Sequence, residues 1–96
     1  MTATQLDVPT LIEKETIPSL NFRDASIEVN QSKTLRFDLE RATSLGNLHH
    51  VKVGIVFQDD NGIKRVNTTI WATGSKYISL KGGLWIPISR IVEIDA

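Results

Sequence analysis

The sequence has no cysteine and no long apolar run. Without cysteine the chain can form neither a disulfide framework nor a thiolate site, and this composition fits a reducing cytosol. A membrane-spanning helix needs roughly 18 to 20 consecutive apolar residues, and no stretch comes near that length. Residues 1–10 also lack the basic start and apolar stretch of a signal peptide. We therefore expect a cytoplasmic protein that does not contact membranes.

Patterns that carry catalysis or metal binding are also missing. The sequence has no phosphate loop, nucleophile elbow or metal-spaced cluster. The pair His49-His50 is adjacent, and adjacent residues of a strand point to opposite faces, so one metal ion is not expected to bind both. The pair Asp59-Asp60 is better explained by turn formation than by acid and base catalysis. We expect a non-enzymatic protein with no cofactor and no metal.

Charge is balanced over the whole chain but not along it. Lys and Arg together number 11, and so do Asp and Glu. Residues 61–92 nevertheless contain no acidic residue, and their five basic residues are Lys64, Arg65, Lys76, Lys81 and Arg90. A region with this excess of positive charge can attract polyanions.

Residues 51–95 show the patterns of short β-strands. Alternate residues are apolar at Val51, Val53, Ile55 and Phe57, as in a half-buried strand. Asn61-Gly62 is a typical two-residue hairpin turn of type I′, which needs positive φ at both positions. Such a turn predicts that Phe57 lies opposite Val66 and that Val53 lies opposite Ile70.

Two further turns predict the next strand pairs. A three-residue loop at residues 74–76 sets Ile70 opposite Leu80 and Ala72 opposite Ile78. A three-residue loop at residues 81–83 keeps apolar faces together, since it pairs Leu80 with Leu84 and Ile78 with Ile86. Pro87 cannot donate a ladder hydrogen bond and belongs near the end of its strand. Residues 91–94 then form a short last strand.

The segment before these strands is expected to contain one helix. Leu35, Leu39, Ala42 and Leu45 form a single helical stripe of about three turns, with Ser32 or Thr34 as N-cap and Gly46 as the C-terminal stop. The alternative is a hairpin, because Leu35, Phe37 and Leu39 also alternate.

Residues 1–32 show no sustained helical or strand period and are expected to be extended or disordered. Their apolar residues are numerous for a free tail, so part of the segment could dock, and residues 26–29 could add a strand. Residues 33–96 are expected to form a single small domain that begins with the helix.

The end of the chain, residues 83–94, resembles the close of a small SH3-like or Sm-like barrel, in which one tight turn leads into a short last strand. Residues 45–48, 68–72 and 80–83 also resemble a group of short bacterial proteins without an assigned activity. The resemblance implies a mainly β fold, namely a small antiparallel SH3-like or Sm-like barrel of about five strands preceded by one short helix.

The turn lengths that place the apolar residues inside place three aromatic residues on the outer face, together with several basic side chains. Exposed rings can stack on bases while Lys and Arg follow phosphates, which is how single-stranded nucleic acid is commonly bound. The candidate binding residues are Arg65, Trp71, Tyr77, Lys81, Trp85 and Arg90. We expect a small binding module that binds single-stranded nucleic acid or regulates a nucleic-acid process.

Two alternatives remain open. The N-terminal helix or tail could pack over the aromatic residues and make them a second core. The domain could instead bind a protein partner or a second copy of itself, through an edge strand or the aromatic face.

Overall fold

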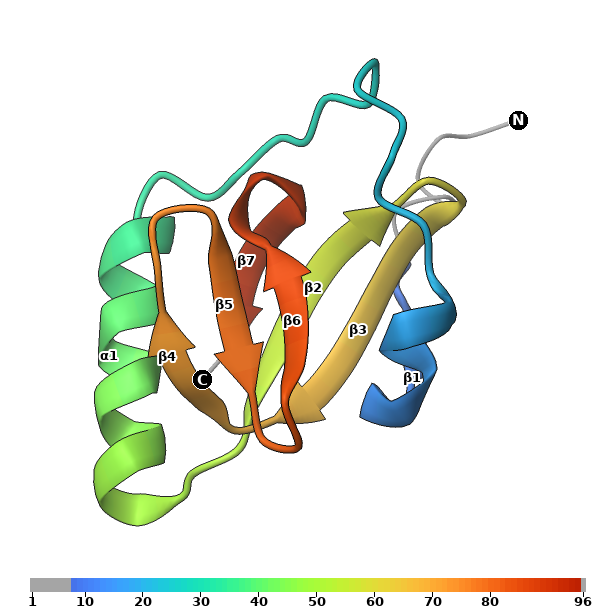
Figure 1. The fold of residues 1–96 in the computed structure, drawn as a ribbon. Coiled ribbons are helices and arrows are strands. Elements are labelled where there is room, and N and C mark those ends of the chain that lie inside the picture. Colours follow the sequence, from blue (N-terminus) through green and yellow to red (C-terminus); the bar gives the residue numbers. More distant parts are fainter. Residues whose placement is uncertain (1–7, 96) are drawn as a thin grey trace.

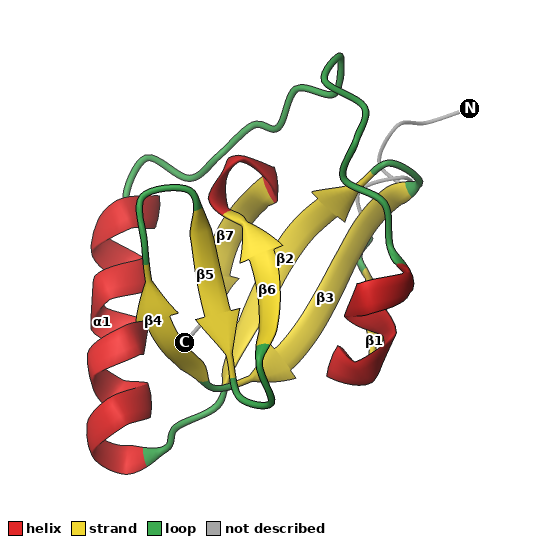
Figure 2. Cartoon of the chain, viewed as in Figure 1, coloured by secondary structure: helices red, strands yellow, loops and turns green. Residues whose placement is uncertain are grey.

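The computed structural model describes residues 8–95, which form a mainly β fold with one α-helix (Figures 1 and 2). The β class and the helix before the main strands are therefore confirmed. The elements are β1 (Thr10–Ile12), the 3-10 helix η2 (Lys14–Ser19), α1 (Leu35–His49), β2 (Val53–Asp59), β3 (Gly62–Thr68), β4 (Ile70–Thr73), β5 (Tyr77–Leu80), β6 (Leu84–Pro87), the 3-10 turn η3 (Ile88–Arg90) and β7 (Ile91–Asp95).

The strands form two sheets with the orders β1-β3-β2-β7 and β4-β5-β6. Only Thr69 separates β3 from β4, so the chain passes from one sheet directly into the other. This break, together with β1 from the N-terminal segment, gives seven strands among the described residues instead of about five.

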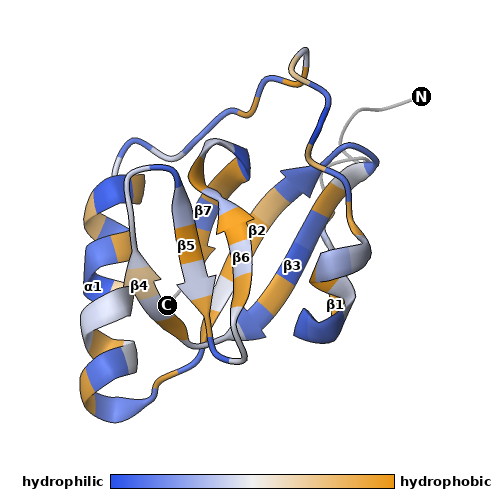
Figure 3. Ribbon diagram, in the orientation of Figure 1, coloured by the Kyte–Doolittle hydropathy of each residue, from blue (hydrophilic) through white to orange (hydrophobic). Residues whose placement is uncertain are grey.

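The hydrophobic core lies between the two sheets. Apolar residues concentrate on the strands, whereas α1 is largely hydrophilic (Figure 3). Each large apolar side chain that is fully buried contributes about 1.5–3 kcal/mol to stability. The largest fully buried apolar side chains are Phe57, Leu39, Ile55, Ile70, Ile78, Leu80, Ile86 and Ile91.

Helix α1 contacts β4 and β7, the end strands of the two sheets, and buries Leu35, Leu39 and Ala42 as predicted. The alternative hairpin does not form. The helix continues past Gly46 to His49, and His50 adopts the left-handed conformation at its end. Gly46 is therefore not a stop signal. A Cβ there would lie 2.3 Å from the carbonyl oxygen of Ile70, so glycine lets the helix lie directly against β4.

The turn between β2 and β3 differs from the predicted one. Asp59 pairs with Gly62, so the turn is centred on Asp60 and Asn61, and only Gly62 has positive φ. The Asp59 carboxylate accepts hydrogen bonds from the backbone N–H groups of Asn61 and Gly62, each at 2.9 Å. This side-chain bonding replaces the type I′ conformation. The predicted partners of Phe57 and Val53 are therefore wrong by two residues, and a shift of two leaves each side chain on its predicted face.

The other pairings follow the prediction except at one bulge. Ile70 lies opposite Leu80, and the β5-β6 pairs are those expected from the loop at residues 81–83. Between Ile70 and Ala72 the register shifts, so Ala72 pairs with Ser79 and Thr73 pairs with Ile78. The predicted pair of Ala72 with Ile78 is wrong because the extra bulge residue turns Ala72 outward.

The described part of the N-terminal segment, residues 8–32, is partly docked. Strand β1 pairs with β3 in parallel, and η2 contacts β6 and β3. Ile17 is buried in the core, and the Phe22 ring lies 6.0 Å from that of Phe57. Residues 26–29 form no strand. Residues 1–7 of the predicted extended segment lie outside the described residues.

Candidate ligand surface

Three aromatic side chains lie exposed on the outer side of the sheet β4-β5-β6. Trp71 is 48% exposed, Tyr77 47% and Trp85 61%, so all three point outward as predicted. We call these three residues the aromatic face. The buried residues Ile70, Ile78 and Ile86 alternate with them along the same strands and anchor each ring to the core.

The backbone pairing determines how the rings are spaced. Ser79 on β5 lies opposite Trp85 on β6, and the bulge of β4 places Trp71 beside the same Ser79. Neighbouring strands are about 4.8 Å apart, so the two Trp backbones lie about 10 Å apart across the small Ser79 side chain. The ring of Tyr77 packs on that of Trp85, with centroids 5.6 Å apart and planes at 58°. The face offers two aromatic platforms with a shallow strip between them.

Basic side chains stand at both ends of the aromatic face. Lys76 precedes Tyr77 and, with Pro87, lines a depression of about 390 Å³ beside the Tyr77 ring. Lys81 follows β5, and its backbone N–H donates to the Thr69 carbonyl at 3.1 Å, close to Trp71. Neither lysine forms an ion pair within the described residues. Both remain available to an anionic ligand.

Arg65 does not belong to the aromatic face. It lies on β3 in the other sheet, where its guanidinium covers Gly54 and pairs with Asp95 at 2.8 Å. A side chain held in this way has less freedom to follow a ligand than Lys76 or Lys81 does.

Arg90 is buried and serves the fold. Its guanidinium donates to the Gln58 carbonyl at 3.1 Å and to the Asp24 carbonyl and an Asp60 carboxylate oxygen, each at 2.8 Å. It also lies over the Phe22 ring, 5.8 Å from its centroid. These contacts join the N-terminal segment to the tip of the β2-β3 hairpin, and they leave Arg90 away from the solvent.

The same cluster shifts the ionisation of Asp60. Partial burial opposes the charged form, but the hydrogen bonds from Arg90 and from the backbone N–H groups of Arg23 and Asp24 outweigh it, so the pKa of Asp60 lies below its ordinary value of 3.8. Asp60 is therefore ionised at neutral pH, where its carboxylate pairs with the Arg90 guanidinium.

The described upstream residues do not cover the aromatic face. Helix α1 packs against β4 and β7, and the N-terminal residues Ile12, Leu20 and Phe22 pack on the core cluster. These segments close the sides of the molecule, between the ends of the two sheets (Figure 1). Within residues 8–95, the alternative of a second core over the Trp residues is therefore wrong.

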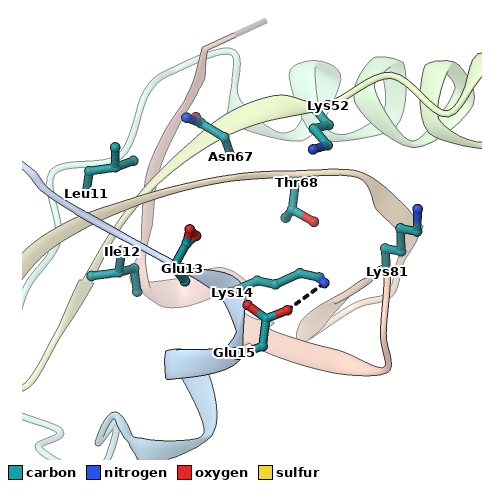
Figure 4. A pocket seen from close by; sticks show the side chains of 9 residues that line it. All are labelled: Leu11, Ile12, Glu13, Lys14, Glu15, Lys52, Asn67, Thr68 and Lys81. Carbon is teal, nitrogen blue, oxygen red and sulfur yellow. Dashed lines mark hydrogen bonds and ion pairs between the residues drawn. The ribbon is translucent and has the colours of Figure 1, made fainter.

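A groove of about 560 Å³ is lined by Lys81 and by none of the residues of the aromatic face (Figure 4). We call it the lysine groove. Its basic side chains come from three separate segments, and its wall is formed in part by β1. The lining residues are Leu11, Ile12, Glu13, Lys14, Glu15, Lys52, Asn67, Thr68 and Lys81. Of these only Lys81 was predicted from the sequence, because no local pattern shows that residues 14, 52 and 81 meet.

Asp59, His49 and His50 lie outside the aromatic face and the lysine groove. Residues 8–95 contain no cluster of three or more His, Cys, Asp or Glu side chains that could hold a metal ion. Asp59 is fully buried, and one of its oxygens accepts from the Lys64 ammonium at 3.1 Å. His49 and His50 are exposed at the end of α1. None of the helices in this part of the chain has the length and apolarity that crossing a bilayer requires.

Comparison of the chain with protein-family models, with curated proteins and with solved structures finds no match.

Proposed function

We propose that this protein is a small non-enzymatic module that binds single-stranded nucleic acid on the aromatic face. The observation that carries the proposal is the exposure of Trp71, Tyr77 and Trp85 on one sheet, with a lysine at each end that forms no ion pair within residues 8–95. Large aromatic side chains are usually buried, so three exposed rings side by side need a reason. Stacking on bases provides one, and the lysines supply partners for phosphates.

We further propose that the fold is an SH3-like or Sm-like small barrel. The order of a helix, then strands, then a single 3-10 turn before the last strand supports this proposal, as does the pairing of β7 with β2. Small β-barrels often present nucleic-acid surfaces of this kind.

Tryptophan fluorescence tests the nucleic-acid proposal directly, because both Trp residues belong to the aromatic face. The protein is titrated with a 12-nucleotide oligothymidine and a 12-nucleotide oligouridine at low and at moderate salt. We expect quenching that saturates, and an affinity that falls steeply as salt rises, because bound phosphates release counterions. An unchanged Trp emission at low salt with both oligonucleotides would refute the proposal.

A matched pair of variants separates stacking from general loss of an aromatic ring. Trp85→Ala should weaken binding by about 1–3 kcal/mol, the usual contribution of one stacked base. Phe37→Ala is the control, since Phe37 on α1 is 60% exposed and Trp85 is 61% exposed. Both variants should fold normally. Equal affinities for the two variants would contradict a role for the aromatic face.

A protein partner or a second copy of the chain is the second candidate, and the position of Trp85 favours it. Trp85 lies on β6, which among residues 8–95 pairs only with β5 and so ends its sheet. An exposed aromatic residue on an end strand can anchor a segment of another chain. Light scattering after size exclusion at high concentration tests self-assembly, and a strict monomer would count against it. An apolar interface should also hold at high salt, where phosphate contacts weaken.

A further inference from the structure

We propose that the lysine groove binds an internal phosphodiester of the same strand whose bases stack on the aromatic face. This inference rests on the proposed function and assigns the path of the sugar-phosphate backbone. It brings in Lys52 and Thr68, two side chains that the aromatic face does not include.

The basic side chains of the groove converge from distant parts of the chain. Lys14 begins η2 and lies against the β5-β6 turn, where a Cβ on Gly82 would be 3.8 Å from the Lys14 side chain. Lys52 precedes β2, and Lys81 begins the turn after β5. The four ion pairs within the described residues involve neither Lys52 nor Lys81. Two ammonium groups that form no ion pair within residues 8–95 therefore line one concave site.

Thr68 supplies an independent indication of a ligand. Its side chain is almost completely buried, at 3% exposure, yet it lines the groove, between Lys52 and Lys14 in the view of Figure 4. The Thr68 hydroxyl forms no hydrogen bond with another residue of 8–95. Among these residues, Asp59 Oδ2 is the one side-chain atom that is both fully enclosed and without a partner. The Thr68 hydroxyl oxygen is therefore not fully enclosed and can be reached from the groove. Buried hydroxyls normally have a partner, so this one is placed to donate to an anion in the groove.

The charge of the groove matches a phosphodiester. Two carboxylates also line it, and Glu15 accepts from Lys14 Nζ at 2.9 Å, a hydrogen bond that lowers the pKa of Glu15. Three lysines against Glu13 and Glu15 leave a net charge of +1. An internal phosphodiester carries about −1, whereas a terminal phosphate carries about −1.5 to −2 at neutral pH. The groove and one internal phosphodiester together therefore carry no net charge, so a phosphate within a strand can bind there without leaving excess charge of either sign.

The groove and the aromatic face are close enough for one strand to touch both. Thr68 and Trp71 are three residues apart on a continuous stretch of chain, which spans at most about 10 Å. The backbone N–H of Lys81 bonds to the Thr69 carbonyl within this stretch. Lys81 thus stands where the groove and the aromatic face meet, and a strand of a few nucleotides can reach from one to the other.

The test uses the full chain, the 12-nucleotide oligothymidine and Trp fluorescence over a salt series. Lys52→Gln/Lys81→Gln should lower the slope of log affinity against log salt by about 0.7, because the groove neutralises one phosphodiester and each phosphate neutralised on a single strand contributes about 0.7. At low salt, binding should weaken roughly fivefold to tenfold. The charge-matched control is Arg23→Gln/Lys33→Gln, whose side chains are exposed and lie outside the groove. The control should retain the wild-type slope.

Thr68→Val removes only the hydroxyl and keeps the branched shape. Binding should weaken about tenfold, as expected for a hydrogen bond to a charged group, while the urea midpoint of unfolding does not fall. A lower midpoint with unchanged binding would show that the hydroxyl serves the fold, and would overturn its assignment to the ligand.

The outcomes separate the two proposals. No Trp response with the wild type refutes the proposed function. A normal Trp response with equal slopes for the groove variant and its control refutes the lysine groove alone. Tighter binding of a 5′-phosphorylated oligonucleotide than of the 5′-hydroxyl form would overturn the assignment to an internal phosphodiester.

Discussion

Replacement of Gly46 by alanine should destabilise the protein, although the same change usually stabilises a helix. Alanine in place of glycine in a helix interior gains about 1 kcal/mol from propensity. At Gly46 the added methyl would lie 2.3 Å from the Ile70 carbonyl oxygen and 2.9 Å from Thr69 Cγ2. The first neighbour is backbone of β4, which cannot rotate away as a flexible side chain can.

The expected magnitude follows from these two opposing effects. Overpacking of this kind costs about 1–3 kcal/mol, and a contact with backbone belongs at the upper end of that range. After the propensity gain is subtracted, we expect a net loss of about 2 kcal/mol, or a fall in Tm of about 8–16 °C for a domain of this size.

Urea and thermal unfolding followed by far-UV circular dichroism measure this loss. The control is Asn47→Ala, the next residue along α1, which is exposed and should gain helix propensity without a clash. If Gly46→Ala matched the wild type or exceeded it in stability, the close approach of α1 to β4 would be refuted. Because β4 also carries Trp71, a displaced β4 should weaken oligonucleotide binding as well.

Two further predictions concern the buried cluster around Arg90. Arg90→Ala leaves the Asp60 carboxylate without its buried partner and should cost about 3 kcal/mol in urea unfolding, with Arg90→Lys intermediate because it keeps the charge but not the fork of donors. The lowered pKa of Asp60 means that its contribution to stability is fully present above about pH 4 and is lost as the pH falls through that lowered pKa. Asp60→Asn should therefore show less loss of stability between neutral and acidic pH than the wild type, and an identical pH profile would contradict the assignment.

The inward and outward faces of the strands could be predicted because side chains alternate between the two faces along a strand. A register that is wrong by two residues therefore leaves every side chain on its predicted face. The β2-β3 register was wrong, yet Ile55 and Phe57 remained inside, because the Asp59 carboxylate moved the turn by one position on each strand. The predicted inward orientation of Ala72 was wrong because a bulge adds one residue and so reverses the alternation of faces beyond it. No residue type in this stretch predicts the bulge from the sequence.

The candidate ligand surface could be predicted only in part. The outward orientation of the three aromatic rings follows from the alternation of side chains within single strands, so it could be predicted from the sequence. Arg90 was misplaced because its partners lie at Asp24, Gln58 and Asp60, far from it in the chain. Lys52 and Thr68 were missed for the same reason: the groove exists only once η2, the start of β2 and the β5-β6 turn have been brought together.

Strand β1 also bears on how the chain avoids aggregation. An open strand edge invites pairing with any neighbouring polypeptide, and a very short terminal strand is one of the ways in which proteins limit this hazard. Here the three residues of β1 pair with the middle three residues of the seven-residue β3, so the edge of β3 that β1 leaves open is divided into two stretches of only two residues each. Since Thr10–Ile12 leaves the ribosome before β3 does, the protecting piece is already present when the vulnerable border forms.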